Sequence, residues 1–596
     1  MADETFDVVV IGSGAGASPL VNTAVKGGMH VLVLEKGPLL RTQQQDPDGL
    51  SDFKRDELLA TGAAKILNVP GMANHGQPYY SSHVEPDLND EPHVYKGEDG
   101  QDRATIEGYT AQVVGGGTQL YGGVSLRFTP DDLRLASFNA GRTDLVGDPN
   151  GDVRREARDW PISYEQLEPY YCTAERMVGI NGTREGQLKP ASQDFYQPPL
   201  DPNAVSRFPA AGMDALGMAR YRTPLAVITE DHEPSGRTVP QDRDTIKTAF
   251  VNRYGDPLGL KSSTWVSLLW PIHGEPNFEL RANCVVTHLS AQGGTVNQVH
   301  YRDPIGRERT VTGRIVVVAC SAIESVRLLK LSAAADPDFA ARIDGNGLLG
   351  AYFLTHCFGG AQCQVPDRAD KSKTLDSDWA TDHCADPDWV RSKGLWAGGA
   401  IYNNTSDAAL PISLARTWAA MDMDNMWKGY LGDPNIVGDQ FVSYLDANFG
   451  KRVSVAFMAN QVPQRTNRID LHPSVTDKWG RPVAYIEKTW HSHDRALMDT
   501  LAEQCHQILV HAGDTTDVSY GSVENSVVRI ANHVLGGIRF GSDPKDSVLD
   551  PDCRAWNFDN LYVTDGGFMP TSGGANPTLT IQANSFRVGD LLLARK

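Results

Sequence analysis

The chain has 596 residues, of which 40% are hydrophobic and 22% are charged, a composition typical of globular proteins. Its formal net charge at pH 7 is −19, and an acidic surface repels nucleic-acid phosphates and anionic lipid headgroups. We therefore expect no nucleic acid among its partners, and no membrane span, because no apolar run approaches the roughly 18 residues that a span requires.

The first segment of the chain is predicted to form a strand, a glycine turn, a helix and a second strand. Phe6–Ile11 is a continuous apolar run, as expected of a strand buried on both faces of a parallel sheet. Ser18–Lys26 suits the following helix, and His30–Leu34 suits the second strand. Because the first apolar run is already a strand and lacks the features of a secretory signal, the sequence predicts a cytoplasmic protein.

The turn between the first strand and the helix carries a dinucleotide-binding motif. Gly12, Gly14 and Ala17 form G-S-G-A-G-A, in which the residues allow a tight turn, a close backbone approach to a pyrophosphate and close helix–strand packing, respectively. The pyrophosphate would lie at the helix N-terminus, where free N–H groups favour anions. Glu35 closes the second strand, where an acid accepts hydrogen bonds from an adenosine ribose. The motif does not separate FAD from NAD.

The rest of the chain changes character several times. Leu40–Ile106 is polar and predicts a loop, and Val113–Val124 is dense in glycine. Trp160–Ile180 has apolar residues at helical spacing after a Pro-Ile-Ser start, with Ser163 as the expected N-cap. The short alternating segments between residues 351 and 520 predict an antiparallel sheet with helical cover, and Asn560–Leu593 returns to strand, glycine loop and helix.

The cysteines and histidines give no sign of a metal centre. The eight cysteines are scattered, none forms a C-x-x-C pair, and no Cys/His group has zinc-ligand spacing. We expect reduced thiols and no metal. His472, His491 and His493 lie in the expected substrate region, and for each we expect a structural or surface role.

Three blocks of sequence, taken together with the N-terminal motif, resemble the glucose-methanol-choline (GMC) oxidoreductases. They are VVGGGTQLYGGVSLRF (Val113–Phe128), ANHVLGGIRFGSDP (Ala531–Pro544) and NLYVTDGGFMPTSGGANPTLTIQA (Asn560–Ala583). The nearest likeness is to the sugar and sugar-acid dehydrogenase and pyranose-oxidase-like branches, with a local similarity to bacterial cholesterol oxidase. The resemblance implies a tightly held FAD, whose flavin end needs backbone donors beyond the N-terminal turn.

The resemblance also implies an α/β fold, in which a Rossmann-like FAD-binding domain of the GMC type holds an inserted substrate domain of antiparallel sheet plus helices. The FAD-binding domain is expected to be discontinuous over residues 1–45, 105–180, 235–350 and 520–596. Residues 181–234 and 351–519 would form the substrate-binding domain, and residues 46–104 a loop.

Two residues match the family's catalytic positions. His533 stands where the family carries its principal catalytic histidine, and Asn576 stands where the family carries a second histidine or an asparagine. An imidazole that titrates near physiological pH can take the hydroxyl proton of an alcohol while hydride leaves its carbon for flavin N5. Asn576 cannot titrate, so we expect it to orient the substrate oxygen by hydrogen bonding.

The remaining candidate residues would hold the cofactor. The resemblance implies that Asp565 contacts the ribityl–pyrophosphate region and that the helix beginning near Thr578 directs its N-terminus at the flavin pyrimidine. No histidine in Gln119–Tyr121 can form the usual covalent flavin link, so we expect non-covalent FAD. The expected cofactor-binding set is Gly12, Gly14, Ala15, Gly16, Ala17, Glu35, Lys36, Gly115, Gly116, Thr118, Tyr121, Gly122, Gly123, Val124, Val285, Asp565, Gly566, Asn576, Pro577 and Thr578.

The sequence favours FAD-dependent oxidation of an alcohol on a sugar, glycoside or polyol. One alternative keeps the mechanism and replaces the substrate with a sterol or another apolar alcohol, and a more distant alternative is a lyase that uses FAD as a scaffold. Tyr121 stands where several family members have an asparagine beside the flavin, so local hydrogen bonding there differs. The electron acceptor, oxygen or a quinone or another acceptor, and the oligomeric state are left open.

Overall fold

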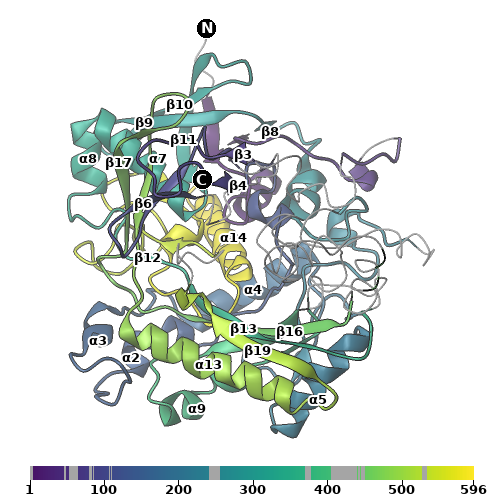
Figure 1. Cartoon of the computed structure of the whole chain (residues 1–596). Helices are drawn as coiled ribbons and strands as arrows, with labels where there is room; N and C mark the ends of the chain where they lie inside the picture. Colours follow the sequence, from purple (N-terminus) through teal and green to yellow (C-terminus); the bar gives the residue numbers. More distant parts are fainter. Residues whose placement is uncertain are drawn as a thin grey trace.

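A computed structural model of the chain describes residues 5–45, 48–52, 65–79, 84, 86–105, 108, 111–240, 256–369, 377–404, 439, 443, 450–525 and 533–596 (Figure 1). Residues 531 and 532 of the histidine-containing block lie outside this part of the chain, as do residues 405–438 of the expected substrate region.

A seven-stranded sheet contains the N-terminal strand predicted from the sequence. Its order is β8-β2-β1-β11-β10-β9, with β21 also paired to β11. The pairs β1–β2, β1–β11, β2–β8 and β11–β21 are parallel, whereas β10 pairs antiparallel with both β11 and β9. The strands are β1 (Thr5–Ile11), β2 (Val31–Leu34), β8 (Phe278–Arg281), β9 (Val285–Gln292), β10 (Thr295–Arg302), β11 (Glu308–Val318) and β21 (Leu561–Val563).

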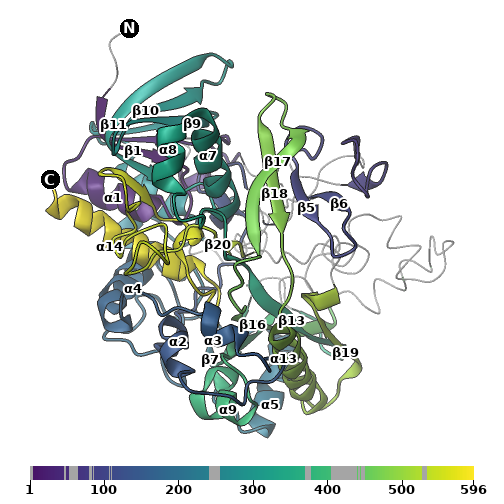
Figure 2. The same cartoon turned by 90° about the vertical axis from the view of Figure 1, so that its left-hand side faces the viewer.

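Helices from opposite parts of the sequence pack beside this sheet. The crossover helix α1 (Ser18–Lys26) lies against α14 (Thr578–Ala594), and α14 also packs on α4 (Tyr164–Val178) (Figure 2). The expected N-cap of α4 is confirmed, because Ser163 Oγ accepts a hydrogen bond from the Gln166 N–H at 3.3 Å. Both ends of the chain thus contribute to the region that carries the glycine motif.

A second, six-stranded sheet has the order β19-β13-β16-β15-β14-β7, and its neighbouring strands are all antiparallel. Helix α13 (Ser492–Val510) packs on β13, β16 and β19, and α5 (Arg207–Ala215) packs on α13 (Figure 1). The strands are β7 (Tyr221–Arg222), β13 (His356–Gln364), β14 (Trp379–Thr381), β15 (Gly399–Asn404), β16 (Arg452–Asn460) and β19 (Thr516–Ser522). This is the antiparallel sheet with helical cover that the sequence predicts.

A third sheet differs from the sequence prediction. It has the order β17-β18-β5-β6, in which β5 (His93–Lys96) and β6 (Asp102–Thr105) fall largely within the segment 46–104 that was expected to be a loop. Its other strands, β17 (Arg468–Thr476) and β18 (Pro482–Glu487), were expected in the substrate sheet but pack on α7 (Ala322–Ala335) (Figure 2). The loop prediction was wrong here because β5, which forms a local hairpin with β6, also pairs with residues of β18 almost 400 positions away, which local polarity cannot report.

The remaining elements are short. Among the described residues, no helix combines the length and the apolar character needed to cross a membrane. These elements are α2 (Leu135–Phe138), α3 (Asp152–Glu156), α8 (Pro337–Ile343), α9 (Pro387–Ser392), β3 (Lys65–Ile66), β4 (Pro78–Tyr79), β12 (Phe353–Leu354) and β20 (Leu535–Gly536).

Candidate active site

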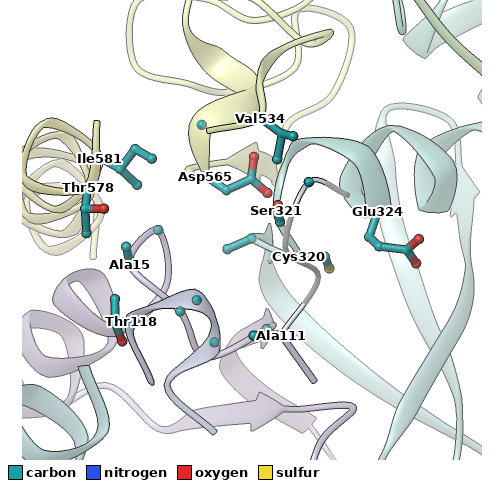
Figure 3. Close-up of a pocket in the computed structure, with 18 of the residues that line it drawn as sticks. Ala15, Ala111, Thr118, Cys320, Ser321, Glu324, Val534, Asp565, Thr578 and Ile581 are labelled. Atoms are coloured by element: carbon teal, nitrogen blue, oxygen red, sulfur yellow. The ribbon is translucent and has the colours of Figure 1, made fainter. Parts of the chain in front are cut away.

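A cavity of about 680 Å³ lies where the glycine turn after β1 meets loops from the middle and the C-terminal part of the chain (Figure 3). Its volume falls within the usual range of small-molecule sites, about 300–1,000 Å³. Of the expected site residues, all line this cavity except Ala17 and Gly115. The expected residues that line it are Gly12, Gly14, Ala15, Gly16, Glu35, Lys36, Gly116, Thr118, Tyr121, Gly122, Gly123, Val124, Val285, His533, Asp565, Gly566, Asn576, Pro577 and Thr578.

The turn after β1 is fixed by two close backbone approaches. Gly12 has φ +98°, and a Cβ there would lie 2.3 Å from the carbonyl oxygen of Ala319. A Cβ at Gly16 would lie 2.6 Å from the Cα of Asp565. The close-packing role expected for Ala17 therefore also falls on Gly16, and its partner is the C-terminal loop.

A chain of hydrogen bonds joins the glycine turn to Glu35 and to the second glycine loop. The Gly115 N–H donates to Ser13 Oγ at 3.0 Å, and the Ser13 hydroxyl donates to Glu35 Oε2 at 2.6 Å. Glu35 Oε1 accepts from the Gly37 N–H at 2.8 Å, and burial raises the pKa of this carboxyl. Ser13 was not predicted as a site residue, and its hydroxyl joins Gly115 to the turn.

The second glycine loop lies directly on the first. A Cβ at Gly116 would lie 3.1 Å from the Cα of Gly14, and the Thr118 hydroxyl donates to the Gly115 carbonyl at 2.5 Å. The Tyr121 hydroxyl donates to the Ser262 carbonyl at 2.7 Å, and burial raises its pKa. Tyr121 therefore lines the cavity with its hydroxyl committed to the backbone.

Asp565 holds the C-terminal loop at the same place. Its Oδ1 accepts from the Gly567 N–H at 2.8 Å, and its Oδ2 accepts from the Ser325 hydroxyl on α7. Burial raises the pKa of Asp565 to about 6, although Ser325 and neighbouring N–H groups favour the ionised form. Figure 3 shows Asp565 close to Ser321, across the cavity from Thr118.

Several cavity residues escaped the sequence analysis because they belong to no recognisable motif. Glu324 on α7 accepts from Arg327 Nη1 at 3.2 Å and lies 3.1 Å from His93 Nε2. Burial opposes its ionisation, but these neighbours, Arg327 foremost, hold the pKa of Glu324 well below its usual value. Arg327 also donates to Asp477 at 2.7 Å, so this end of the cavity is charged and internally paired.

The expected catalytic residues lie in the same cavity. The Oδ1 atom of Asn576 is buried and has no hydrogen-bond partner within the described part of the chain. His533 contacts His356, with 3.2 Å between their Nδ1 atoms. No motif marks His356, and the sequence analysis did not select it.

The opposite wall of the cavity comes from the six-stranded sheet. Phe358 lies on β13, Tyr402 and Asn404 lie two positions apart on β15, and Ala456 and Met458 lie two positions apart on β16. Because side chains alternate along a strand, each of these pairs shares one face of the sheet. This wall is built mainly from apolar and aromatic side chains, in contrast to the glycine-rich side.

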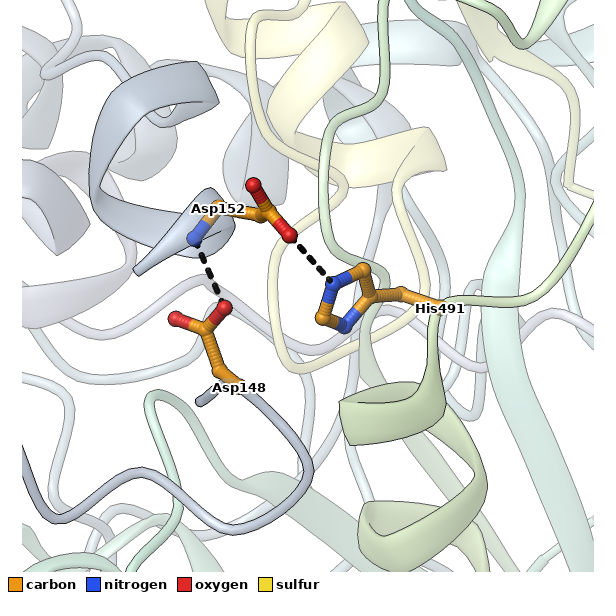
Figure 4. Close-up of side chains that lie close together, drawn as sticks. All are labelled: Asp148, Asp152 and His491. Carbon is orange, nitrogen blue, oxygen red and sulfur yellow. Dashed lines mark hydrogen bonds and ion pairs between the residues drawn. The ribbon is translucent and has the colours of Figure 1, made fainter. Parts of the chain in front are cut away.

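A group of side chains outside the cavity lining has the composition of a metal site. Asp148, Asp152 and His491 each place one ligand atom within 4.8 Å of the others (Figure 4). Asp148 accepts from the first two N–H groups of α3, and His491 Nδ1 accepts from the His493 N–H at the start of α13. These helix-capping bonds explain the cluster, and we assign no metal to it.

The residues of the cavity fit FAD. The two stacked glycine loops leave no Cβ atoms between the backbone and the cavity at Gly14 and Gly116, and the N-termini of α1 and α14 both border it. The unpartnered Asn576 oxygen indicates that the cavity holds a polar ligand.

Comparison with known proteins reveals relatives of the chain. The GMC oxidoreductase family model matches residues 463–585, a segment that includes His533, Asp565 and Asn576. The chain is 28% identical over 589 residues to the 6'''-hydroxyparomomycin C oxidase of Streptomyces lividus, covering 98% of this chain and 91% of that protein. The chain is thus similar to the GMC oxidoreductases, and the family model covers the C-terminal segment of that likeness.

Other relatives agree with this assignment. A 2-methyl-1,2-propanediol dehydrogenase of Mycolicibacterium austroafricanum is 26% identical over 100% of this chain and 96% of its own length. A formate oxidase variant of Aspergillus oryzae RIB40 has the same fold, with a TM-score of 0.63 at 12% identity over 100% of this chain and 99% of that chain. A cholesterol oxidase of Mycobacterium tuberculosis matches over 64 residues, 11% of this chain. The chain is an FAD-dependent oxidoreductase that acts on CH–OH donors.

Proposed function

We propose that the enzyme oxidises a hydroxyl group of a sugar, an aminoglycoside or a small polyol, with His533 as the base and Asn576 as the group that orients the alcohol. One observation carries the proposal: a single cavity contains both residues together with the two glycine loops that fit FAD. When bound, FAD supplies the acceptor for the hydride that leaves the carbinol carbon.

In this proposal the residues of the chain move and hold a proton. The imidazole of His533 takes the hydroxyl proton as the C–H bond breaks, because an alkoxide releases hydride far more readily than an alcohol does. The amide of Asn576, with its buried and unpartnered oxygen, accepts or donates one hydrogen bond at the substrate oxygen. Together they fix which face of the carbinol carbon meets the cofactor.

The substrate class follows from the side chains that the six-stranded sheet contributes to the cavity wall and from the net charge of the chain. Tyr402 and Asn404 place polar groups among apolar ones on the six-stranded sheet, which suits a ring that is apolar on its faces and polar at its edge. The net charge of −19 favours a cationic amino sugar over a sugar acid. The relatives from Streptomyces lividus and Mycolicibacterium austroafricanum act on an aminoglycoside and on a diol, which supports the same class of substrate. No comparable observation supports a sterol, since the cholesterol oxidase likeness is local.

The proposal extends to the cofactor linkage and to the domains. Gln119, Leu120 and Tyr121 offer no histidine for a covalent flavin link, so acid precipitation should release FAD into the supernatant. The seven-stranded sheet with its helices would be the FAD-binding domain, and the six-stranded sheet the core of the substrate domain. Flavin that stays on the denatured chain would contradict the non-covalent linkage.

The experiment that tests the function is an anaerobic reduction screen on the holoenzyme. The panel contains paromamine, 2-methyl-1,2-propanediol, glucose, gluconate and cholesterol, and bleaching of the flavin absorbance reports hydride transfer. We expect the amino sugar to reduce the flavin fastest. Reduction by cholesterol alone would overturn the substrate class, and no bleaching by any alcohol would contradict the proposal. Reoxidation by oxygen and by a quinone then identifies the acceptor.

A further inference from the structure

His356 is placed opposite His533 by the pairing of two short strands. Strand β12 pairs antiparallel with β20, and Leu354 is the partner of Leu535. The same register, extended two residues beyond the paired strands, sets His356 at the start of β13 opposite His533. His356 is completely buried and lies behind His533, the histidine that lines the cavity.

The rings of His356 and His533 are within hydrogen-bond distance through their two Nδ1 atoms. Their Nδ1 atoms are 3.2 Å apart, and their planes meet at 82° with 5.0 Å between the ring centres. One of the two Nδ1 atoms must carry the hydrogen and the other must accept it. Because a neutral imidazole has a single N–H, the ring that donates through Nδ1 keeps its lone pair on Nε2.

The charge state of His356 and the proposed role of His533 together set the direction of this bond. Burial, and next the neighbouring His533, lower the pKa of His356 well below its ordinary value, so the ring is neutral. The backbone at Ser572, Gly573 and Ala575 acts in the opposite sense and raises this pKa, but by less than burial lowers it. The buried Nε2 atom of His356 has no hydrogen-bond partner within the described residues. A base at His533 needs a free lone pair on Nε2, so its Nδ1 must carry the hydrogen and Nδ1 of the neutral His356 is the acceptor.

We propose that His356 is a positioning residue that accepts a hydrogen bond from the Nδ1–H of His533 and so holds the Nε2 lone pair of His533 ready for the alcohol proton. The inference rests on the proposed role of His533 as the base. The opposite tautomer would place a hydrogen on Nε2 of His533, where it could not take the alcohol proton.

The test combines a tautomer measurement with reduction rates on the holoenzyme. Two-bond ¹H–¹⁵N spectra of ¹⁵N-histidine-labelled protein show which ring nitrogen carries the hydrogen, and the signals of His533 are those lost in His533→Asn. The variants are His356→Leu, which removes the acceptor, and His356→Asn, whose amide oxygen can replace Nδ1. The matched control is His493→Leu, because His493 is also completely buried and its bonds within the described part of the chain go to Val146, Trp396 and its own helix turn.

We expect the wild-type His533 to carry its hydrogen on Nδ1 and His356→Leu to show mixed tautomers. Flavin reduction by the fastest alcohol of the panel should slow about 10- to 100-fold in His356→Leu, the usual cost of removing a group that orients a functional histidine. His356→Asn should restore most of the rate, and His493→Leu should lower stability without changing either readout.

A hydrogen on Nε2 of wild-type His533 would overturn the inference, even if no variant folds. A wild-type reduction rate in His356→Leu would overturn it as well. If the tautomer shifts in His356→Leu while His533→Ala still reduces at the wild-type rate, the positioning contact stands and the proposed function of His533 fails.

Discussion

The two sides of the cavity are built from different parts of the polypeptide. On the cofactor side, glycine loops at residues 12–16 and 115–123 present backbone, and side chains such as Ser13 and Thr118 bond within the protein. On the substrate side, strands β13, β15 and β16 present alternate side chains. Backbone recognises what all members of a family share, whereas side chains can be exchanged without disturbing a sheet. We infer that the substrate side is the part of this enzyme that determines specificity.

We expect the largest effect on the reaction rate from replacing His533, the proposed base. His533→Ala should retain FAD and the fold but slow anaerobic flavin reduction by about 10²–10⁴, the usual contribution of a general base. Stopped-flow bleaching with the fastest alcohol of the panel measures the rate. Loss of FAD from His533→Ala, with a near wild-type rate in the remaining holoenzyme, would place His533 among the structural residues.

The two sides should also respond to pH in opposite directions. Burial lowers the pKa of His493 to about 4, so its stabilising contribution is present above the unfolded value of about 6.5 and is lost as the pH falls towards 4. Burial raises the pKa of Asp565 to about 6, so its contribution is present at low pH and is lost as the pH rises through 6. The shift of His493 corresponds to on the order of 3 kcal/mol at pH 4.

Hydrogen exchange of the holoenzyme at pH 5 and pH 7.5 checks this contrast, after correction for intrinsic rates. At pH 5, amides of α13 and its sheet should lose protection relative to those around β21. In His493→Leu the loss at α13 should disappear. Equal changes on both sides would show that these groups do not control local stability.

A smaller effect is expected from crowding the cofactor side. Gly16→Ala would place a Cβ 2.6 Å from the Cα of Asp565, so backbone must move, at a cost of about 1–3 kcal/mol. We expect reduced FAD content and a lower melting temperature. Gly274→Ala is the control, because a Cβ there meets nothing within 4 Å. Full FAD occupancy in Gly16→Ala would show that the contact between the two loops is dispensable.

The smallest effect is expected on the substrate side. Tyr402→Phe removes one hydroxyl from the wall, and the loss of one neutral hydrogen bond, about 1 kcal/mol, should raise KM about fivefold with little change in kcat or FAD content. Tyr95→Phe is the control, because Tyr95 is a completely buried tyrosine whose hydroxyl donates to the Lys488 carbonyl outside the cavity lining. A large loss of FAD in Tyr402→Phe would erase the distinction between the two sides.

The same contrast explains what could be predicted from the sequence. Gly12, Gly116 and Asp565 could be found because a backbone that bends tightly or approaches a phosphate requires particular residues at particular spacings. His356 and Met458 could not be found, because any buried strand offers such residues, and only the register of distant strands brings them to the cavity. The wrong loop prediction for residues 46–104 has the same cause. The sequence around β5 is polar, and β5 is a strand because it pairs with β18.

The contact between Gly16 and the C-terminal loop sets an order of events during synthesis. The Gly16 carbonyl accepts hydrogen bonds from the hydroxyls of Thr564 and Ser585, and β21 completes the parallel part of the central sheet. During translation the N-terminal glycine turn is therefore synthesised several hundred residues before the C-terminal loop that it contacts. FAD capture should be a late, post-translational step. Messages truncated before residue 565 should yield chains that carry the nucleotide motif intact and bind no flavin.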